Sequence, residues 1–234
     1  MLNKFFKSVL CLIAIVLVSF SGNAQNGRQT AAADAAGALG GAGSAAGIIN
    51  FLSLTPPGWL VLGGGALIGG VAGSLAVYES QPLIEKAPEY LANSLNTMDY
   101  VGAKHNEILV DYLKVNKSYT PDVFLEFSKK YDTNNKSVDI KFLSTQYSEM
   151  KNLKNYEDVV QYTLKQLPKD VDKKEFADFL RRIGKLEDLK VFISEVKRFE
   201  NTLISNQSFS DGAIGQLSVY FSTLRYSAFL WNKK

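Results

Sequence analysis

The stretch Ser210–Trp231, SDGAIGQLSVYFSTLRYSAFLW, has apolar residues at helical spacing from its first turn to its last. Ser210 is a suitable N-cap, because its hydroxyl can accept a hydrogen bond from a backbone N–H of the first helical turn. The apolar positions after this cap are Ile214, Leu217, Tyr220, Phe221, Leu224, Phe229 and Trp231. The stretch therefore predicts an α-helix with a large aromatic face to bury.

The rest of residues 79–234 repeats this pattern. Thr120 with Pro121 predicts one further helix start, and Asp172 with Glu175 forms a capping box that predicts another. Other apolar stripes occur at Val101, Ile108, Leu109 and Tyr112, at Ile140, Phe142 and Leu143, and at Tyr156, Val159, Val160, Leu164 and Leu167. The region shows no strand-like alternation and no internal repeat. It predicts an all-α domain, a bundle of about six to seven amphipathic helices.

Residues 1–24 predict a signal peptide. Its start, MLNKFFK, carries two lysines and no acid, and the apolar run of residues 9–20 is shorter than the ~20 residues that a membrane span needs. Gly22 and Ala24 occupy the small-residue positions of a cleavage site, so we expect cleavage after Ala24. Cys11 lies near the start of the apolar run, which does not match a lipid attachment site. The ending Asn-Ala-Gln resembles leaders of Bacteroidota, which implies export to the periplasm, the outer envelope or the medium.

Charge and composition exclude several classes of protein. The formal net charge is +3, and removal of Lys4 and Lys7 with the leader leaves about +1 with acids and bases interspersed. This balance gives no electrostatic basis for binding nucleic acid. A single Cys and a single His also exclude a disulfide scaffold, a zinc site built on Cys and His, and a Cys-His nucleophile pair.

Residues 25–78 differ in composition from residues 79–234. Only Arg28 and Asp34 are charged in the first region, whereas the second carries 23 basic and 22 acidic residues. The turn sequence Thr-Pro-Pro-Gly at 55–58 divides the first region into two halves of about twenty residues. The pattern predicts a helical hairpin of small and apolar residues, with a separate helical domain from residue 79 onward.

Glycines in the second half of this hairpin have the spacing of closely packed helices. Gly65, Gly69 and Gly73 lie four residues apart on one helical face, and Gly37 and Gly41 offer a matching surface on the first half. Each glycine inside a helix costs about 1 kcal/mol relative to Ala, so the pattern favours close helix packing over an isolated helix. The run GGGALIGGVAGSLA resembles glycine-zipper segments of bacterial envelope proteins. The hairpin also resembles, in outline, the central hairpin of pore-forming bacteriocins.

Three environments fit the hairpin. The two halves have the length of membrane helices, no charge occurs between Asp34 and residue 79, and Trp59 and Tyr78 lie where aromatic rings favour the membrane surface. Alternatively, the region is a flexible linker, above all at residues 26–47. In the third interpretation the hairpin is buried inside a soluble fold and inserts into a membrane later.

His105 is the only imidazole of the chain and lies in the sequence VGAKHNEIL. On a helix it shares the inward stripe of Val101 and Leu109. The nearby acids, Glu107 and Asp111, are not three or four residues away, so neither lies on the same face as His105. A structural histidine is therefore favoured over a general base or a metal ligand.

This segment resembles a G-x-x-H-N pattern of uncharacterised exported bacterial proteins, in which an R-Y-S-x-x-x-W ending also occurs. The residues that carry the resemblance here are Gly102, His105, Asn106, Arg225, Tyr226, Ser227 and Trp231. The resemblance implies that His105 and Asn106 contact the C-terminal helix in a packing role. It implies no catalytic activity.

No motif of an enzyme is found. Residues 132–139 resemble a calcium loop only superficially, because Lys136 occupies an oxygen position and Leu143 stands where the bidentate Glu is needed. A phosphate-binding loop and a Gly-x-Ser-x-Gly elbow are both missing from the sequence. We therefore expect no catalytic, cofactor or metal site.

These observations predict a non-enzymatic exported envelope protein. It is expected to associate with a membrane, or with itself, through residues 31–78, and to present the helical domain to an unknown protein partner. The alternative is a secreted bacteriocin-like or pore-forming effector whose apolar hairpin inserts into a target membrane. A soluble binding module with a Gly/Ala-rich tether is the third possibility.

Overall fold

The computed structural model describes most of the chain after the predicted leader. The described residues are 27–43, 66, 69–71, 73–74, 86–116, 120–131 and 140–232. Within them the regular structure is helical and no strand occurs, which confirms the predicted all-α class. The leader at 1–24, Trp59, Gly65 and Tyr78 lie outside the described residues.

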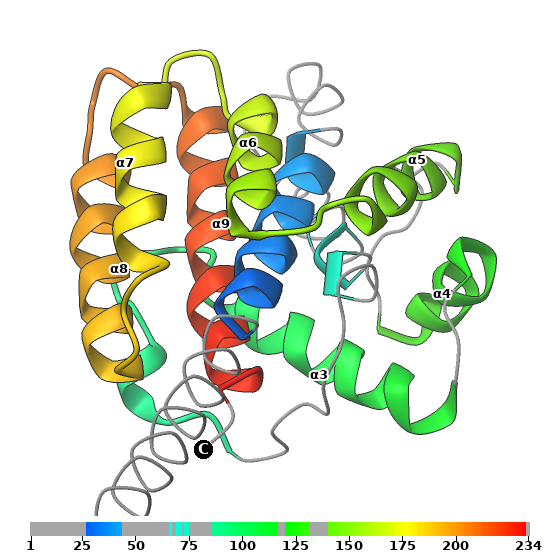
Figure 1. Ribbon diagram of the computed structural model, residues 1–234. Helices are drawn as coiled ribbons and strands as arrows, with labels where there is room; N and C mark the ends of the chain where they lie inside the picture. Colours follow the sequence, from blue (N-terminus) through cyan, green and yellow to red (C-terminus); the bar gives the residue numbers. More distant parts are fainter. Residues whose placement is uncertain are drawn as a thin grey trace, which may run out of the picture.

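From α6 (Tyr156–Gln166) to α9 (Asp211–Leu230) the helices follow one another with short connections (Figure 1). A helix covers residues 27–43, and residues 66, 69–71 and 73–74 are helical as well; the latter residues are called segment 66–74 below. The remaining elements are the short 3-10 helix η1 (Glu89–Leu91), α3 (Tyr100–Val115), α4 (Pro121–Ser128), the short 3-10 helix η2 (Lys129–Tyr131), α5 (Ile140–Lys151), α6 (Tyr156–Gln166), α7 (Lys173–Ile183), α8 (Leu189–Ile204) and α9 (Asp211–Leu230).

The predicted caps begin their helices. The side chain of Thr120 accepts a hydrogen bond from the backbone N–H of Val123, with Pro121 in the first turn of α4. Asp172 accepts two backbone hydrogen bonds at the start of α7. Ser210 accepts one at the start of α9. Local side-chain acceptors thus set where these helices start.

Helix α9 is buried on every side, which differs from the amphipathic helix that its sequence predicts. Every residue from Leu217 to Trp231 is buried, because α3, α8 and the helix of residues 27–43 surround it. Two serines lie on different faces of α9, Ser222 toward the start of α3 and Ser227 toward the helix of residues 27–43. Their short hydroxyl groups find partners inside the protein, so these faces are buried without being wholly apolar.

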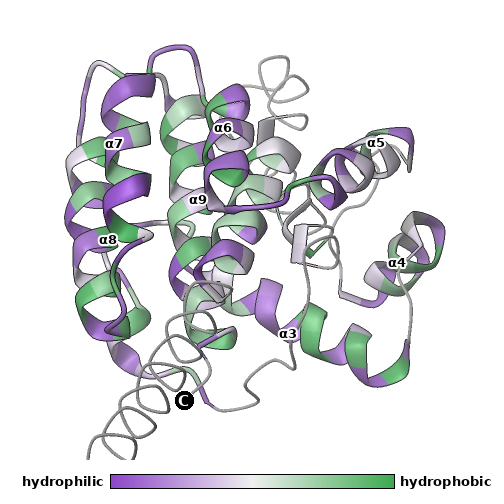
Figure 2. Ribbon diagram, viewed as in Figure 1, coloured by the Kyte–Doolittle hydropathy of each residue, from purple (hydrophilic) through white to green (hydrophobic). Residues whose placement is uncertain are grey.

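Aromatic side chains hold α7 and α8 against α9. The rings of Phe179 and Phe199 stack with centroids 4.1 Å apart, and Phe176 meets Tyr220 edge to face at 5.4 Å. Figure 2 shows that α7 and α8 alternate between hydrophilic and hydrophobic residues, as expected for helices with one face in water.

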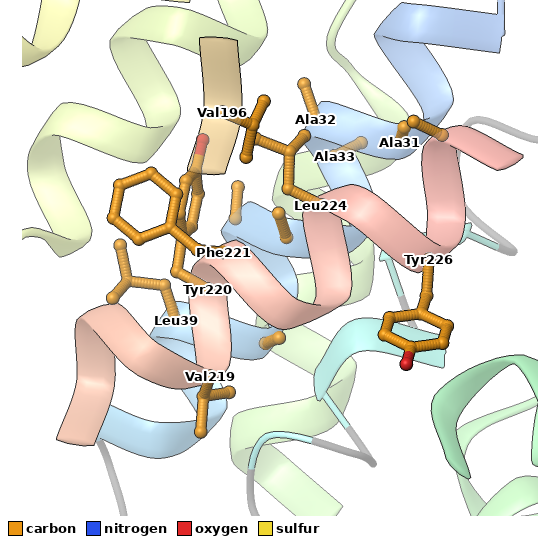
Figure 3. Packing of buried hydrophobic residues seen from close by; sticks show 14 of the residues in the cluster. Ala31, Ala32, Ala33, Leu39, Val196, Val219, Tyr220, Phe221, Leu224 and Tyr226 are labelled. Atoms are coloured by element: carbon orange, nitrogen blue, oxygen red, sulfur yellow. The ribbon is translucent and has the colours of Figure 1, made fainter. Parts of the chain in front are cut away.

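The helix of residues 27–43 belongs to this same core. Ala31, Ala32, Ala33 and Leu39 are at most 1% exposed, and Figure 3 shows them around the aromatic residues of α9. Residues on both sides of the composition change at residue 79 therefore form one hydrophobic cluster. That change does not separate two cores.

Among the described residues, no helix combines the length and the hydropathy that a span of the bilayer requires.

Candidate functional site

Glycine residues bring the helix of residues 27–43 and segment 66–74 into backbone contact. A Cβ atom on Gly69 would overlap the carbonyl oxygen of Gly37, and one on Gly37 would overlap that of Gly69. A Cβ atom on Gly73 would lie 2.6 Å from the carbonyl oxygen of Ala33. These contacts require residues without side chains on both helices. We call this contact the glycine seam.

A carboxylate lies at the end of the seam, deep inside the protein. Asp34 is fully buried and accepts hydrogen bonds at Oδ2 from the Ser227 hydroxyl and, at 2.8 Å, from the indole N–H of Trp231. Its second oxygen, Oδ1, makes no hydrogen bond of normal geometry. An unpaired buried acceptor is unfavourable, so the protonation state of this group matters to the fold.

His105 lies beside Asp34 and is also fully buried. Its Nε2 atom is 3.5 Å from the hydroxyl of Ser74, and its Nδ1 atom is 3.1 Å from Oδ1 of Asn106. Asn106 in turn donates to the backbone carbonyl of Tyr226 at 2.8 Å. We call Asp34, Ser74, His105 and Asn106 the buried polar chain.

The surroundings of Asp34 act on its pKa in opposite directions. Burial raises the pKa, and it is the strongest effect. The charge of His105 and the hydroxyl groups of Ser227 and Ser74, together with the Trp231 indole, lower it. The net result is a raised pKa, so the protein favours the neutral carboxyl group more than water does.

A second cluster surrounds Arg225 on the next turn of α9. Its guanidinium donates two hydrogen bonds to the buried carboxylate of Glu200, at 2.9 and 3.0 Å, and a further one to Asp99. Another N–H of Arg225 bonds the carbonyl of Leu91. Asn96 donates to Glu200 at 2.6 Å. We call Arg225, Glu200, Asp99 and Asn96 the arginine cluster.

Charge balance in this cluster keeps the arginine ionised. Burial works to lower the pKa of Arg225, but the carboxylates of Glu200 and Asp99 more than offset it, and the pKa is raised. A buried ion pair of this kind holds its neighbours in one arrangement. Here it fixes the segment around η1 against α8 and α9.

Two further contacts join the helices. Gly102 lets α3 approach α9, because a Cβ atom there would overlap the carbonyl oxygen of Ser222, and its N–H donates to the Ser222 hydroxyl at 2.8 Å. Arg28 is 2% exposed and donates to the carbonyls of Leu186, Glu187 and Ala228. Burial lowers the pKa of Arg28 to about 10.

Tertiary structure brings together most of the residues that the sequence singled out. Asn106 donates to the carbonyl of Tyr226 in α9 and also lies within hydrogen-bond distance of His105. Gly69 and Gly73 lie in the glycine seam. Ser227 and Trp231 bond Asp34, and Arg225 belongs to the arginine cluster.

Sequence reasoning missed Asp34, Ser74, Glu200 and Asp99 as members of these clusters. One signal was present for Asp34, because it is one of two charges in an otherwise uncharged stretch of 54 residues. A charge in such a stretch needs a partner if the stretch is buried.

The arrangement of these described residues offers charge pairing in the interior of the protein. Asp34, Ser74 and His105 are buried, so a substrate cannot reach them. Among the described residues, no group of three or more His, Cys, Asp or Glu side chains could hold a metal ion. Comparison of the chain with models of protein families, with curated proteins and with solved structures finds no match.

Proposed function

We propose that the protein is an exported, non-enzymatic protein of the bacterial envelope that stores its Gly/Ala-rich segment in a helical bundle and inserts it into a membrane when the bundle opens. The observation that carries this proposal is the burial of the glycine seam, in which Ala33, Ala66 and Val71 are 0% exposed. Storage of this kind fits an effector that shields its hairpin until insertion. It fits a permanently inserted anchor less well.

Composition supports the membrane step. Residues 35–78 carry no charge, and their small residues allow close helix packing in lipid as well as in a protein core. Asp34, at the start of this stretch, would enter a membrane only as a neutral group. Burial already raises its pKa in the folded protein, so the neutral form costs less there than in water.

Release of dye from vesicles tests this proposal. Vesicles of phosphatidylethanolamine and phosphatidylglycerol are mixed with the purified protein and with the variant Gly69→Leu, whose side chain would force the seam apart. Gly212→Leu is the matched control, because a Cβ atom at Gly212 meets nothing within 4 Å. We expect Gly69→Leu to release dye several times faster than wild type, and Gly212→Leu to behave as wild type.

A second control separates release of the segment from general loss of stability. Phe179→Ala removes a buried ring between α7 and α8, far along the chain from the seam, and is expected to destabilise the fold strongly. If Phe179→Ala releases dye as fast as Gly69→Leu at equal stability, the segment has no specific role. If neither variant releases dye, the segment is only a core element. Deletion of residues 31–78 is unsuitable as a control, since it removes part of the core.

A further inference from the structure

Helix α5 is held in place by few buried side chains. Among its side chains that the structure describes, only Gln146 and Met150 are buried, and the others are exposed or half-buried. The two residues lie four positions apart, so they face the same side of the helix. By contrast, α7 buries a complete stripe from Phe176 to Ile183. Contact through so few buried side chains predicts that α5 leaves the bundle at a lower cost in free energy than α7 does.

Both buried side chains of α5 contact the glycine seam. The amide nitrogen of Gln146 donates a hydrogen bond at 3.0 Å to the carbonyl oxygen of Gly37. A Cβ atom on Gly69 would overlap this same oxygen, so Gln146 reaches the closest point of the seam. On the other half of the seam, a Cβ atom on Gly73 would lie 2.9 Å from Cε of Met150. Helix α5 therefore covers both halves of the seam.

The glycine at position 40 is explained by α5. A Cβ atom on Gly40 would lie 2.8 Å from the amide nitrogen of Gln146, which is the donor to Gly37. Space beside Gly40 is therefore needed for the hydrogen bond between α5 and the seam. The helix of residues 27–43 thus uses Gly37 to approach segment 66–74, and Gly40 to admit the side chain of Gln146.

The arrangement of the helices allows α5 to move without the rest of the bundle. In Figure 1 the helix of residues 27–43 lies between α9 and α5. Contacts of α5 with the other labelled helices are chiefly with α4, and α4 packs against α3. The ring contacts that hold α7 and α8 against α9 come from residues of those three helices. Movement of α5 would therefore uncover the seam and leave this aromatic core in place.

The closed position of α5 leaves one buried polar atom without a partner. Oε1 of Gln146 makes no hydrogen bond of normal geometry, although the side chain is 2% exposed. A buried acceptor without a partner is unfavourable, whereas water bonds it once the helix moves out. The closed position is thus favoured by the bond to Gly37 and by the burial of Met150, and it is opposed by Oε1.

We propose that α5 is a lid over the glycine seam, which opens locally while α7, α8 and α9 keep their aromatic core. The bond of Gln146 to Gly37 and the packing of Met150 on Gly73 hold the lid closed. The lid deepens the storage role proposed above and rests on it, because its opening is the step that precedes departure of the stored segment.

Hydrogen exchange followed by mass spectrometry tests the lid in the absence of membranes. Exchange of a protected backbone amide reports how often its segment opens. In the wild-type protein we expect the slowest amides of α5 to exchange about tenfold faster than those of α7 and α8, because α5 has fewer buried contacts to break. Equal rates in the three helices would contradict local opening.

Substitution of the two buried residues of α5 tests whether the lid protects the seam. Gln146→Ala removes the bond to the seam, and should raise exchange about fivefold in α5 and in the helix of residues 27–43. Met150→Ala leaves a cavity beside the seam and should raise it by more than about tenfold. Glu149→Ala, an exposed change on the same helix, is the matched control and should stay close to wild type. Alanine is favourable in helices, so loss of helix propensity does not explain an increase.

A double-mutant cycle with Gly40→Ala tests the contact with Gln146. In the wild-type background the added methyl group displaces the amide of Gln146, so exchange should rise in α5 and in the helix of residues 27–43. In the Gln146→Ala background this obstacle is removed, and exchange should fall instead, because Ala is more favourable than Gly inside a helix. An effect of the same sign and size in both backgrounds would contradict the proposed contact.

Two further results contradict the lid. If Gln146→Ala and Met150→Ala speed exchange in α7 and α8 as much as in α5, then α5 belongs to one cooperative core. If they speed exchange in α5 and leave the helix of residues 27–43 unchanged, then α5 frays without protecting the seam. Exchange in α7 and α8 also shows, in the same sample, that each variant is folded.

Failure of the lid can be distinguished from failure of the storage role. If exchange shows local opening but neither Gln146→Ala nor Gly69→Leu releases dye from vesicles, the lid stands and membrane insertion is wrong. If Gly69→Leu releases dye but exchange shows no local opening of α5, the storage role stands and the lid is wrong.

Discussion

The buried polar chain and the arginine cluster contact α9 within about one helical turn of each other. Their charges differ in how fully they are compensated. Arg225 is fully buried and meets two carboxylates and a backbone carbonyl. Asp34 is equally buried, but one of its oxygens has no partner and its charge is opposed by burial. A cluster whose charges balance can act as a permanent clamp, whereas an unbalanced group responds to protons.

The two clusters also join different parts of the bundle. The arginine cluster joins the segment around η1 to α8 and α9 within residues 86–232. The buried polar chain joins the Gly/Ala-rich segments to α3 and α9. The proposed release of the glycine seam therefore breaks contacts of the buried polar chain and leaves the arginine cluster in place.

The largest effect is expected from Glu200→Gln. The change leaves the guanidinium of Arg225 buried with less countercharge, and should lower the free energy of unfolding by about 3–5 kcal/mol. Denaturant unfolding at neutral pH measures this loss. Glu195→Gln on the same helix removes a surface pair with Arg198 and should change stability far less. Equal effects of the two substitutions would contradict the idea that the arginine cluster acts as a permanent clamp.

Trp231→Phe is expected to have the next largest effect. It deletes the indole donor to Asp34, which should cost about 1–3 kcal/mol when the carboxylate is ionised. The cost should be greater at high pH than at low pH, because burial raises the pKa of Asp34 and a neutral carboxyl group needs that donor less. Lost packing alone would lower stability by the same amount at both pH values, which unfolding curves can show.

Thr120→Ala is a reference substitution outside both clusters, against which the other losses of stability can be compared. Loss of the cap of α4 should cost about 1 kcal/mol at every pH from 6 to 9, because the hydroxyl does not titrate. Thermal unfolding at several pH values measures it. A pH-dependent loss would indicate that the pH dependence expected for Trp231→Phe is not specific to the contacts of Asp34.

Glu157→Gln should have the smallest effect at neutral pH. Hydrogen bonds from Arg181 lower the pKa of Glu157 from 4.5 to about 2, but both side chains are largely exposed and solvent screens the pair. Its stabilising contribution is present above about pH 4.5 and is lost as pH falls through about 2. Melting temperatures from pH 2 to 9 should differ from wild type only by a small offset that disappears in acid. A change in the alkaline range would be unexpected.

Local patterns predicted the helices because helices depend on nearby residues. The caps at Thr120, Asp172 and Ser210 act on backbone groups two or three residues away. The spacing of Gly69 and Gly73 likewise predicted close contact with another helix, and both glycines meet the helix of residues 27–43. Membrane association and self-association through this region remain predictions.

Partners distant in sequence could not be predicted in this way. Ser227 and Trp231 bond an aspartate 193 and 197 residues away, and Arg225 lies 126 residues from Asp99. Helical periodicity predicts which face of a helix is apolar. It does not predict which polar group of a distant segment contacts a given residue of that helix. The burial of α9 on all sides results from such contacts, because Ser222 and Ser227 meet their partners only when distant segments pack against the helix.

The sequence by itself determined that the chain is helical, where several helices begin, and that its small-residue region must pack closely against something. Each of these depends on interactions over a few residues. Only the tertiary structure decided that this region lies in the core of the bundle, and that Asp34 bonds Ser227 and Trp231 there. Burial and charge depend on how distant helices pack, and those contacts exist only once the chain has folded.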